Sequence, residues 1–183
     1  MNAPVDVSHI RLETERLILR PWQDADLQDL YEYARVQGVG EMAGWKHHAS
    51  PEESKTILDM FIREKKTFAL ELKENTKVIG SLGLEELCSD PEKDGKLGRE
   101  IGYVLSKDYW GRGLMPEAVS AVIRYCFDIL NFDYLTCGHF IHNDRSRRVV
   151  EKMGFHYFGE TRYKTQCNSM EITRNYVLYN PIK

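Results

Sequence analysis

A Gly-Arg-Gly turn stands at the start of a helix-compatible segment, in the stretch YWGRGLMPEA, Tyr109–Ala118. The first turn of a helix has backbone N–H groups without intrahelical partners and carries the positive end of the helix dipole. Glycines allow the backbone to approach an anion closely, and Arg112 adds a permanent charge with a planar fork of donors. The stretch predicts either an anion-binding turn, typically for phosphate, or a tight strand-to-helix turn without a ligand.

Two common phosphate-binding motifs are excluded for this turn. A Walker A loop needs Gly-Lys followed by Ser or Thr, and a dinucleotide-binding fingerprint needs G-x-G-x-x-G. Neither pattern is present at Trp110–Met115. The turn therefore argues against NAD and P-loop nucleotides, and a protein that uses it to bind ATP is kept only as a weak alternative.

The elements that must position this turn follow from the periodicity of apolar residues. Ser50, Pro51 and two acidic residues form a strong helix start, with Ser as the cap and Pro at the first helical position. Helices are predicted over residues 27–36, 51–66, 116–130 and 142–155, and strands over 14–20, 67–72, 77–87, 97–105, 132–140, 156–163 and 175–180. The order predicts an α/β (α+β) domain over residues 1–183, with a mixed, mostly antiparallel, twisted sheet of about seven strands and one parallel pair joined by a crossover helix.

Composition limits the class of protein. The 183 residues carry a net charge of −3 with a sequence pI of about 6.1, which argues against nucleic acid as the main partner. No apolar run reaches the length of a membrane span, and the N-terminus lacks the apolar core of a signal peptide. The widely spaced cysteines and the histidines show no metal-ligand spacing, so we expect a cytoplasmic protein with free thiols and no metal site. These cysteines are Cys88, Cys126, Cys137 and Cys167.

A second motif shows which known proteins the segment around the glycine turn is similar to. The pattern N-x-x-S-x-x-x-x-E-K-x-G-F runs from Asn143 to Phe155, about 30 residues after the turn. Together with LETERLILRP, EIGYVL and the Trp-Gly-Arg-Gly turn, it resembles the GNAT superfamily of acyl-CoA N-acyltransferases, and most of all the RimJ/RimL-like branch of ribosomal-protein N-terminal acetyltransferases. The resemblance covers the chain from about Arg11 to Tyr179, in order.

The resemblance implies acetyl-CoA as co-substrate, bound between two splayed parallel strands. The family's pyrophosphate loop, Q/R-x-x-G-x-G/A, aligns with Trp110, Gly113 and Met115. Met115 departs from the small residue of the family, so its side chain must point away from the phosphates. The cofactor-binding residues that we expect are Val104, Leu105, Trp110, Gly111, Arg112, Gly113, Leu114, Met115, Asn143, Ser146, Arg148 and Lys152.

These residues have distinct expected roles. The amides of Gly111–Met115 and the Arg112 side chain would hold the diphosphate. The ends of strand 97–105 and the Asn143 side chain would bind the pantetheine arm, by resemblance. Arg148 and Lys152 lie one helical turn apart, so both could reach phosphates, although a solvated helix face explains them equally well.

Acyl transfer from a thioester to an amine also needs a neutral amine and a thiolate that can leave. Many superfamily members place a Tyr seven residues after the motif Asn, where this chain has Val150. Ser146 is the remaining hydroxyl and is our candidate proton donor, although it could instead cap the helix. A thiolate with a pKa near 8.5 also leaves without help.

The general base is open between several residues. Glu100 and His139 are the catalytic candidates, and Glu85 and His142 are alternatives. Each is more often structural than catalytic when taken singly. Three residues are expected to line the acceptor site, namely Trp45, His47 and Glu85.

The sequence therefore predicts a cytoplasmic acetyl-CoA-dependent N-acetyltransferase that transfers the acetyl group directly, because no cysteine falls in the motifs. The acceptor would be a primary amine, on a protein N-terminus or on a small molecule such as a polyamine, amino acid or antibiotic. A non-catalytic acyl-CoA sensor is the other alternative. Dimers are common in this branch, so a homodimer is compatible with the resemblance.

Overall fold

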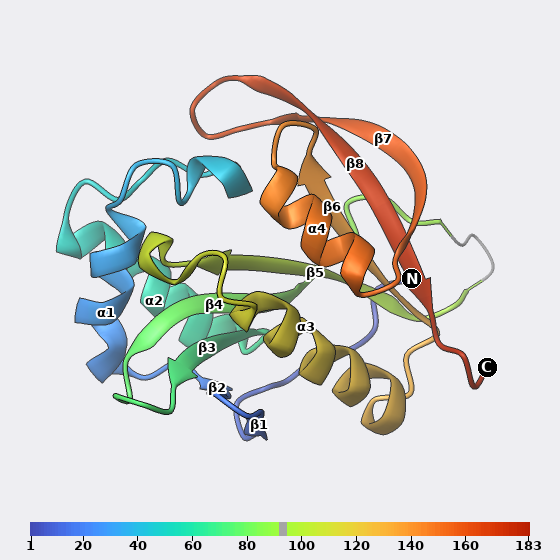
Figure 1. Ribbon diagram of the computed structural model, residues 1–183, viewed down its shortest axis with the longest axis horizontal. Helices are drawn as coiled ribbons and strands as arrows, with labels where there is room; N and C mark the ends of the chain where they lie inside the picture. The colour runs from blue at the N-terminus through green and yellow to red at the C-terminus, as the bar shows by residue number, and fades with distance from the viewer. Residues whose placement is uncertain (92–94) are drawn as a thin grey trace.

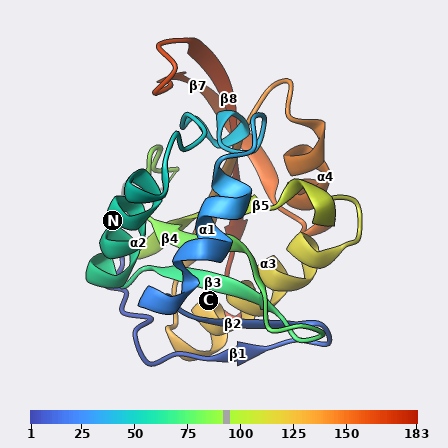
Figure 2. The ribbon, with the colours of Figure 1, turned by 90° about the vertical axis from the view of Figure 1, so that its left-hand side faces the viewer.

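One mixed sheet runs through the molecule, with helices on both of its faces (Figures 1 and 2). The computed structural model describes residues 1–91 and 95–183, and within them the sheet has eight strands in the order β1-β2-β3-β4-β5-β6-β8-β7. All neighbours are antiparallel except β5 and β6, which are parallel. The strands are β1 (Leu12–Glu13), β2 (Leu17–Pro21), β3 (Thr67–Leu72), β4 (Val78–Glu85), β5 (Gly98–Leu105), β6 (Tyr134–Phe140), β7 (His156–Lys164) and β8 (Met170–Tyr179).

The sheet separates two hydrophobic cores. Helices α1 (Leu27–Ala34) and α2 (Pro51–Glu64) cover one face, and α3 (Leu114–Arg124) and α4 (Asp144–Lys152) cover the other (Figure 2). Successive strand residues point to opposite faces, so Ala69 packs under α1 and α2 while its neighbour Leu70 packs under α3. The predicted start of α2 is confirmed, because the Ser50 hydroxyl accepts the Glu53 N–H and Pro51 is the first helical residue.

The parallel strands β5 and β6 part soon after they meet. Within the described residues they pair only from Gly98–Tyr134 to Glu100–Thr136. Beyond Glu100, β5 continues beside β4 as far as Leu105, whereas β6 continues beside β8 as far as Phe140. The sheet therefore opens into a wedge between β5 and β6, with one backbone edge of β5 unpaired on that side (Figure 1).

The fold class is confirmed, and the element boundaries differ most in three places. The first predicted strand, residues 14–20, begins only at Leu17 as β2, because the chain turns at Thr14, whose N–H donates to the Leu17 carbonyl; β1 lies before it. Helix α3 begins at Leu114 rather than at residue 116, and after Arg124 it continues as a π-helical turn, Tyr125–Ile129. Strand β8 begins at Met170 rather than at residue 175, because it pairs with β7 to form a long hairpin.

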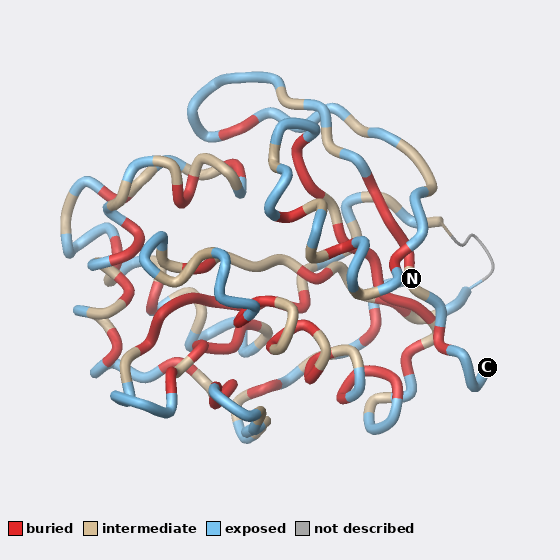
Figure 3. Tube along the Cα trace, in the orientation of Figure 1, coloured by how far each residue is buried: buried red, intermediate tan, exposed pale blue. Residues whose placement is uncertain are grey.

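The tip of this hairpin is exposed, whereas buried residues follow the central strands (Figure 3). A polar turn predicted over residues 89–96 lies partly outside the described residues. Within the described residues, no helix combines the length and apolar character that crossing a bilayer requires.

The start of the wedge offers a test of the packing. A Cβ added at Gly98 would lie 2.5 Å from the ring of Tyr134, which is fully buried. We expect Gly98→Ala to lower the free energy of unfolding by about 1–3 kcal/mol, because the ring must move in a packed core. Gly159→Ala is the matched control, since a Cβ there meets nothing within 4 Å. Urea denaturation measures both, and equal stabilities of the two variants would contradict the packing.

Candidate active site

The glycine turn has the backbone that the sequence predicts. Gly111 and Gly113 have φ of 77° and 76°, in the left-handed region that favours glycine. Helix α3 begins directly after Gly113, so the N–H groups of its first turn open at this point. The Trp110 indole Nε1–H donates to the Leu105 carbonyl at 2.8 Å, which fixes the turn to the end of β5.

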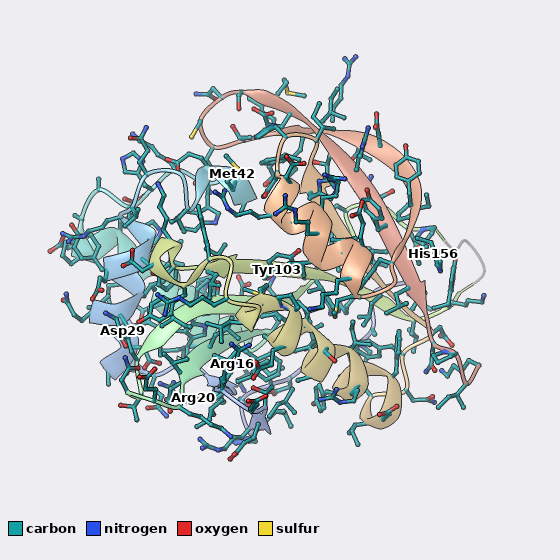
Figure 4. All side chains as sticks on the ribbon, viewed as in Figure 1. Arg16, Arg20, Asp29, Met42, Tyr103 and His156 are labelled. Carbon is teal, nitrogen blue, oxygen red and sulfur yellow. The ribbon has the colours of Figure 1, made fainter. Side chains whose placement is uncertain are left out.

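A side-chain clamp supports the turn from outside. The Arg16 guanidinium donates to the Arg112 carbonyl at 2.9 Å and, through Nε, to the Glu117 carboxylate at 2.8 Å. The same carboxylate accepts the Arg16 N–H and the Thr14 hydroxyl. Thr14 and Arg16, which the sequence placed in the first predicted strand, therefore tie the β1–β2 corner to the first turn of α3 (Arg16 is labelled in Figure 4).

A cleft of about 560 Å³ runs from the glycine turn through the wedge to the far face of the sheet. Arg148 and Lys152 line it, as does Arg145, which the sequence analysis did not single out. The Arg145 guanidinium lies over the Trp110 ring, 4.2 Å from its centroid. None of these three cations forms an ion pair with a described residue. The glycine-turn end of the cleft is therefore positively charged.

The other expected cofactor residues lie mostly along the cleft, with one exception. Val104, Leu105, Trp110, Gly111, Gly113, Leu114 and Met115 all line it. Met115 is buried in the main core, so its longer side chain does not crowd the turn. Arg112 is not among the lining residues; its guanidinium lies over the Tyr109 ring at 5.1 Å. Only the backbone of Arg112 belongs to the turn.

Asn143 connects the two sides of the cleft. Its Oδ1 accepts the Ser146 N–H at 3.2 Å, so Asn143, rather than Ser146, caps α4. Its Nδ2 donates to the Met42 carbonyl at 3.3 Å, in the short helical turn η2 (Glu41–Ala43). The Asn143 amide is therefore already bonded to protein at both ends.

A pair of hydroxyl groups lies in the wedge. The Tyr103 hydroxyl, from β5, is 2.8 Å from the Ser146 Oγ, from α4, and both residues line the cleft (Tyr103 is labelled in Figure 4). Burial raises the pKa of Tyr103 well above its ordinary value, so the phenol stays protonated. Val150, at the position of the family's Tyr, is buried in the core. Nothing in the sequence singled out Tyr103, because its alternation with Ile101 and Leu105 indicates only a strand.

Two carboxylates lie on the opposite face of the sheet. Glu85 and Glu100 face each other across β4 and β5, and both line the cleft. Burial raises the pKa of Glu100, and the nearby Glu85 charge adds to the rise, while the Cys88 N–H opposes it. Glu85 is itself paired with the Lys66 ammonium at 2.8 Å. Glu100 is thus a carboxylate with an elevated pKa at the wall of the cleft.

The three histidine candidates all have protein partners, and of the three only His139 lines the cleft. The His139 ring is buried and stacked on Tyr176, with Nδ1 bonded to the Phe140 carbonyl and Nε2 3.3 Å from the Tyr176 hydroxyl. His142 lies 3.7 Å from Glu171 and does not line the cleft. His47 Nδ1 lies 2.7 Å from Glu41 Oε1, and His47 lines neither the cleft nor the second cavity beside it. Trp45 lines that second cavity.

Comparison with known proteins identifies the family. The family model for the acetyltransferase (GNAT) domain matches residues 16–156. The chain belongs to the GNAT acetyltransferases. The predicted resemblance is therefore confirmed, and the chain is an N-acetyltransferase that uses acetyl-CoA as its co-substrate.

Curated relatives agree with this assignment, and a solved structure agrees with the fold. The GNAT chain is 28% identical to the uncharacterized N-acetyltransferase YoaA of Bacillus subtilis over 176 residues, which cover 93% of this chain and 97% of the relative. It is 25% identical to the ribosomal protein uS5-alanine N-acetyltransferase of Escherichia coli, over 82% of this chain and 80% of that one. A GNAT acetyltransferase structure from Bacillus anthracis superposes with a TM-score of 0.82 at 20% identity, covering 93% of this chain and 99% of the other.

The glycine turn of this GNAT chain fits the diphosphate of coenzyme A, because left-handed glycines, open helix N–H groups and three cations meet there. Within the described residues, no group of His, Cys, Asp and Glu side chains could hold a metal ion.

A matched pair of variants tests the turn. Asn and Asp both tolerate positive φ and have the same shape, so Gly113→Asn and Gly113→Asp differ mainly by one negative charge. We expect Asp to bind coenzyme A about tenfold or more weakly than Asn, since like charges about 4 Å apart repel by about 1–4 kcal/mol. Titration calorimetry at low salt measures this, and equal affinities of the two variants would remove the turn from the diphosphate site.

Proposed function

We propose that this chain acetylates a primary amine by direct transfer from acetyl-CoA, with the two substrates meeting in the wedge between β5 and β6. The carrying observation is that one cleft joins a cationic glycine turn on one face of the sheet to Glu85 and Glu100 on the other. A charged thioester carrier fits the first end, and an amine that must lose a proton fits the second.

Different groups along the cleft would bind the two ends of acetyl-CoA. The glycine turn, Arg145, Arg148 and Lys152 hold the diphosphate end of acetyl-CoA. The unpaired edge of β5 accommodates its extended arm, as an added strand would be accommodated. The ammonium first loses one proton to Glu100. The amine nitrogen then forms a bond to the acetyl carbon and loses a second proton, the bond from that carbon to sulfur breaks, and the departing thiolate takes up one proton.

Glu100 would accept the proton that the amine loses. A base must be deprotonated to act, and the raised pKa of Glu100 brings its basicity closer to neutral pH. Tyr103 and Ser146 would relay the second proton to the departing thiolate, because their hydroxyls form a protonated pair at the wedge that can give one proton as it takes up another. His139 takes no role in this proposal, since both of its ring nitrogens already have partners.

The cysteines support direct transfer rather than a thiol-bound intermediate. A nucleophilic cysteine needs a lowered pKa. Burial raises the pKa of Cys88, which lines the cleft, to about 11, and that of Cys137, beside Tyr103, to about 12. Neither thiol is a thiolate at neutral pH.

The base is tested by its pH profile. We expect Glu100→Gln to lower kcat about 100-fold or more, the usual scale of general-base catalysis. In the unsubstituted chain kcat should fall as the pH drops through the raised pKa of Glu100, because the protonated form is inactive. Glu85→Gln should move this acidic limb to lower pH, since it removes a neighbouring negative charge. A Glu100→Gln enzyme with more than a third of the activity would exclude Glu100 as the base.

The hydroxyl pair is tested by a double-mutant cycle. Tyr103→Phe and Ser146→Ala should each lower kcat about tenfold, with unchanged affinity for coenzyme A. The double variant should be no worse than the more damaged single variant, because groups that act as one unit are not additive. Stopped-flow assay of thioester loss gives the rates, and wild-type kcat in both single variants would show that the thiolate leaves unassisted.

A further inference from the structure

A second cavity, of about 320 Å³, lies beside the cleft, between α1, α2 and the sheet. The lining residues that it shares with the cleft are Ala43, Glu85, Gly102, Tyr103 and Val104. The two spaces are therefore adjacent at the carboxylate end, where the acceptor amine would meet the acetyl group under the proposed function.

The helix side of this cavity is apolar. Leu30 from α1 and Ile57, Met60 and Phe61 from α2 line it, and the Trp45 side chain from the connecting segment also lines it. Trp45 packs directly over Gly40, where a Cβ would lie 2.1 Å from the ring. A smaller apolar cavity of roughly 150 Å³ is enough to take a benzene-sized molecule. The space is thus large enough for an aromatic or branched aliphatic group.

The sheet side carries polar groups and bare backbone. The Thr67 Oγ1 is buried and has no hydrogen-bond partner among the described residues. It lies 3.3 Å from the point where Gly83 would carry a Cβ, and Gly83 faces Gly102 across β4 and β5. The Glu85 carboxylate bends back over the same glycine. A buried polar atom without a partner is rare in folded proteins, and here it borders a cavity that adjoins the transfer point.

The charged residues around the cavity leave no buried carboxylate free for a second cation among the described residues that line it. Glu85 is paired with Lys66, Glu53 is exposed and accepts the Ala49 N–H, and Lys46 adds a positive charge to the lining. Burial lowers the pKa of His48, which is bonded to Ser54. A diamine or an aminoglycoside would have to bury a further ammonium group against apolar walls, which is costly without a partner.

From this arrangement we infer that the acceptor is a primary amine on an apolar body. The body occupies the cavity under α1 and α2, and the amine lies at the boundary with the cleft, beside Glu85 and Glu100. The inference rests on the proposed function and names its substrate class. Two sources carry this chemistry, a free arylalkylamine and the α-amine of a peptide whose first residue is large and apolar.

A series of amines tests the class at saturating acetyl-CoA. We expect kcat/KM, corrected for the neutral fraction of each amine, to rise at least tenfold from ethylamine to 2-phenylethylamine, and 1,4-diaminobutane to be no better than butylamine. Peptides that begin with Phe or Ala form the second arm, and better turnover of the Phe peptide than of 2-phenylethylamine assigns the amine to a peptide. A flat series, or a preference for the diamine, overturns the inference while leaving acetyl transfer intact.

Binding separates this inference from the proposed function. If no amine is acetylated, the proposed function fails. Calorimetry of 2-phenylethylamine against the protein saturated with coenzyme A still tests the cavity, because it needs no turnover. Binding there supports the inference, and no heat of binding at millimolar amine overturns it.

Variants locate the site. Ile57→Trp should fill the cavity and raise KM for 2-phenylethylamine at least tenfold, with unchanged KM for acetyl-CoA and for ethylamine. Ile62→Trp on the same helix is the control, because Ile62 is exposed and does not line the cavity. Thr67→Val should raise KM for the favoured amine without loss of stability, since it removes an unpartnered hydroxyl. Wild-type KM in both Ile57→Trp and Thr67→Val overturns the inference.

Discussion

The short parallel pairing of β5 with β6 is the constraint on which the rest of this molecule depends. Parallel strands normally share an evenly spaced hydrogen-bond ladder along their whole length. Here the ladder ends at Glu100, and the two strands follow different antiparallel neighbours from that point. The site is therefore a consequence of sheet topology, because a continuous ladder would leave no passage between the two faces.

The passage separates two electrostatic environments. On one face, helix N–H groups and three cations without an ion-pair partner among the described residues provide a positive end. On the other, Glu100 lies in a partly buried position beside Glu85, where ionisation is disfavoured. Tyr103 lies between these ends and stays neutral. The arrangement suits a reaction in which an anionic carrier and a cation that must lose its proton approach from opposite sides.

The sequence predicted the parts of this site that depend on local backbone chemistry. Gly111 and Gly113 were recognisable because only a special backbone needs two glycines at a helix start, and Ser50-Pro51 because capping is local. The role of Arg112 was less accessible, since a side chain's direction depends on which aromatic ring lies nearby. Sequence distance also hid the contact of Tyr103 with Ser146, which joins residues 43 positions apart.

The cavity beneath α1 and α2 lay beyond sequence reasoning for a related reason. Its walls come from two helices, the segment that connects them, three strands and the turn between β7 and β8. Trp45 and Glu85, which the sequence placed at the acceptor site, do line it, but the apolar residues from α1 and α2 indicated only core packing. Only the unpartnered Thr67 hydroxyl distinguishes the space from packing, and hydrogen-bond satisfaction is visible only in three dimensions.

The hydrogen bonds of the Asn143 amide couple the binding of the two substrates. One end of this side chain starts the helix that carries Ser146 and Arg148, and the other holds the η2 segment that precedes Trp45. If one substrate orders either segment on binding, the second substrate binds to segments that are already ordered. Its own binding free energy then no longer includes the cost of ordering them. Such coupling is reciprocal by thermodynamic necessity, so whatever factor the thioester confers on amine affinity, the amine must return to the thioester.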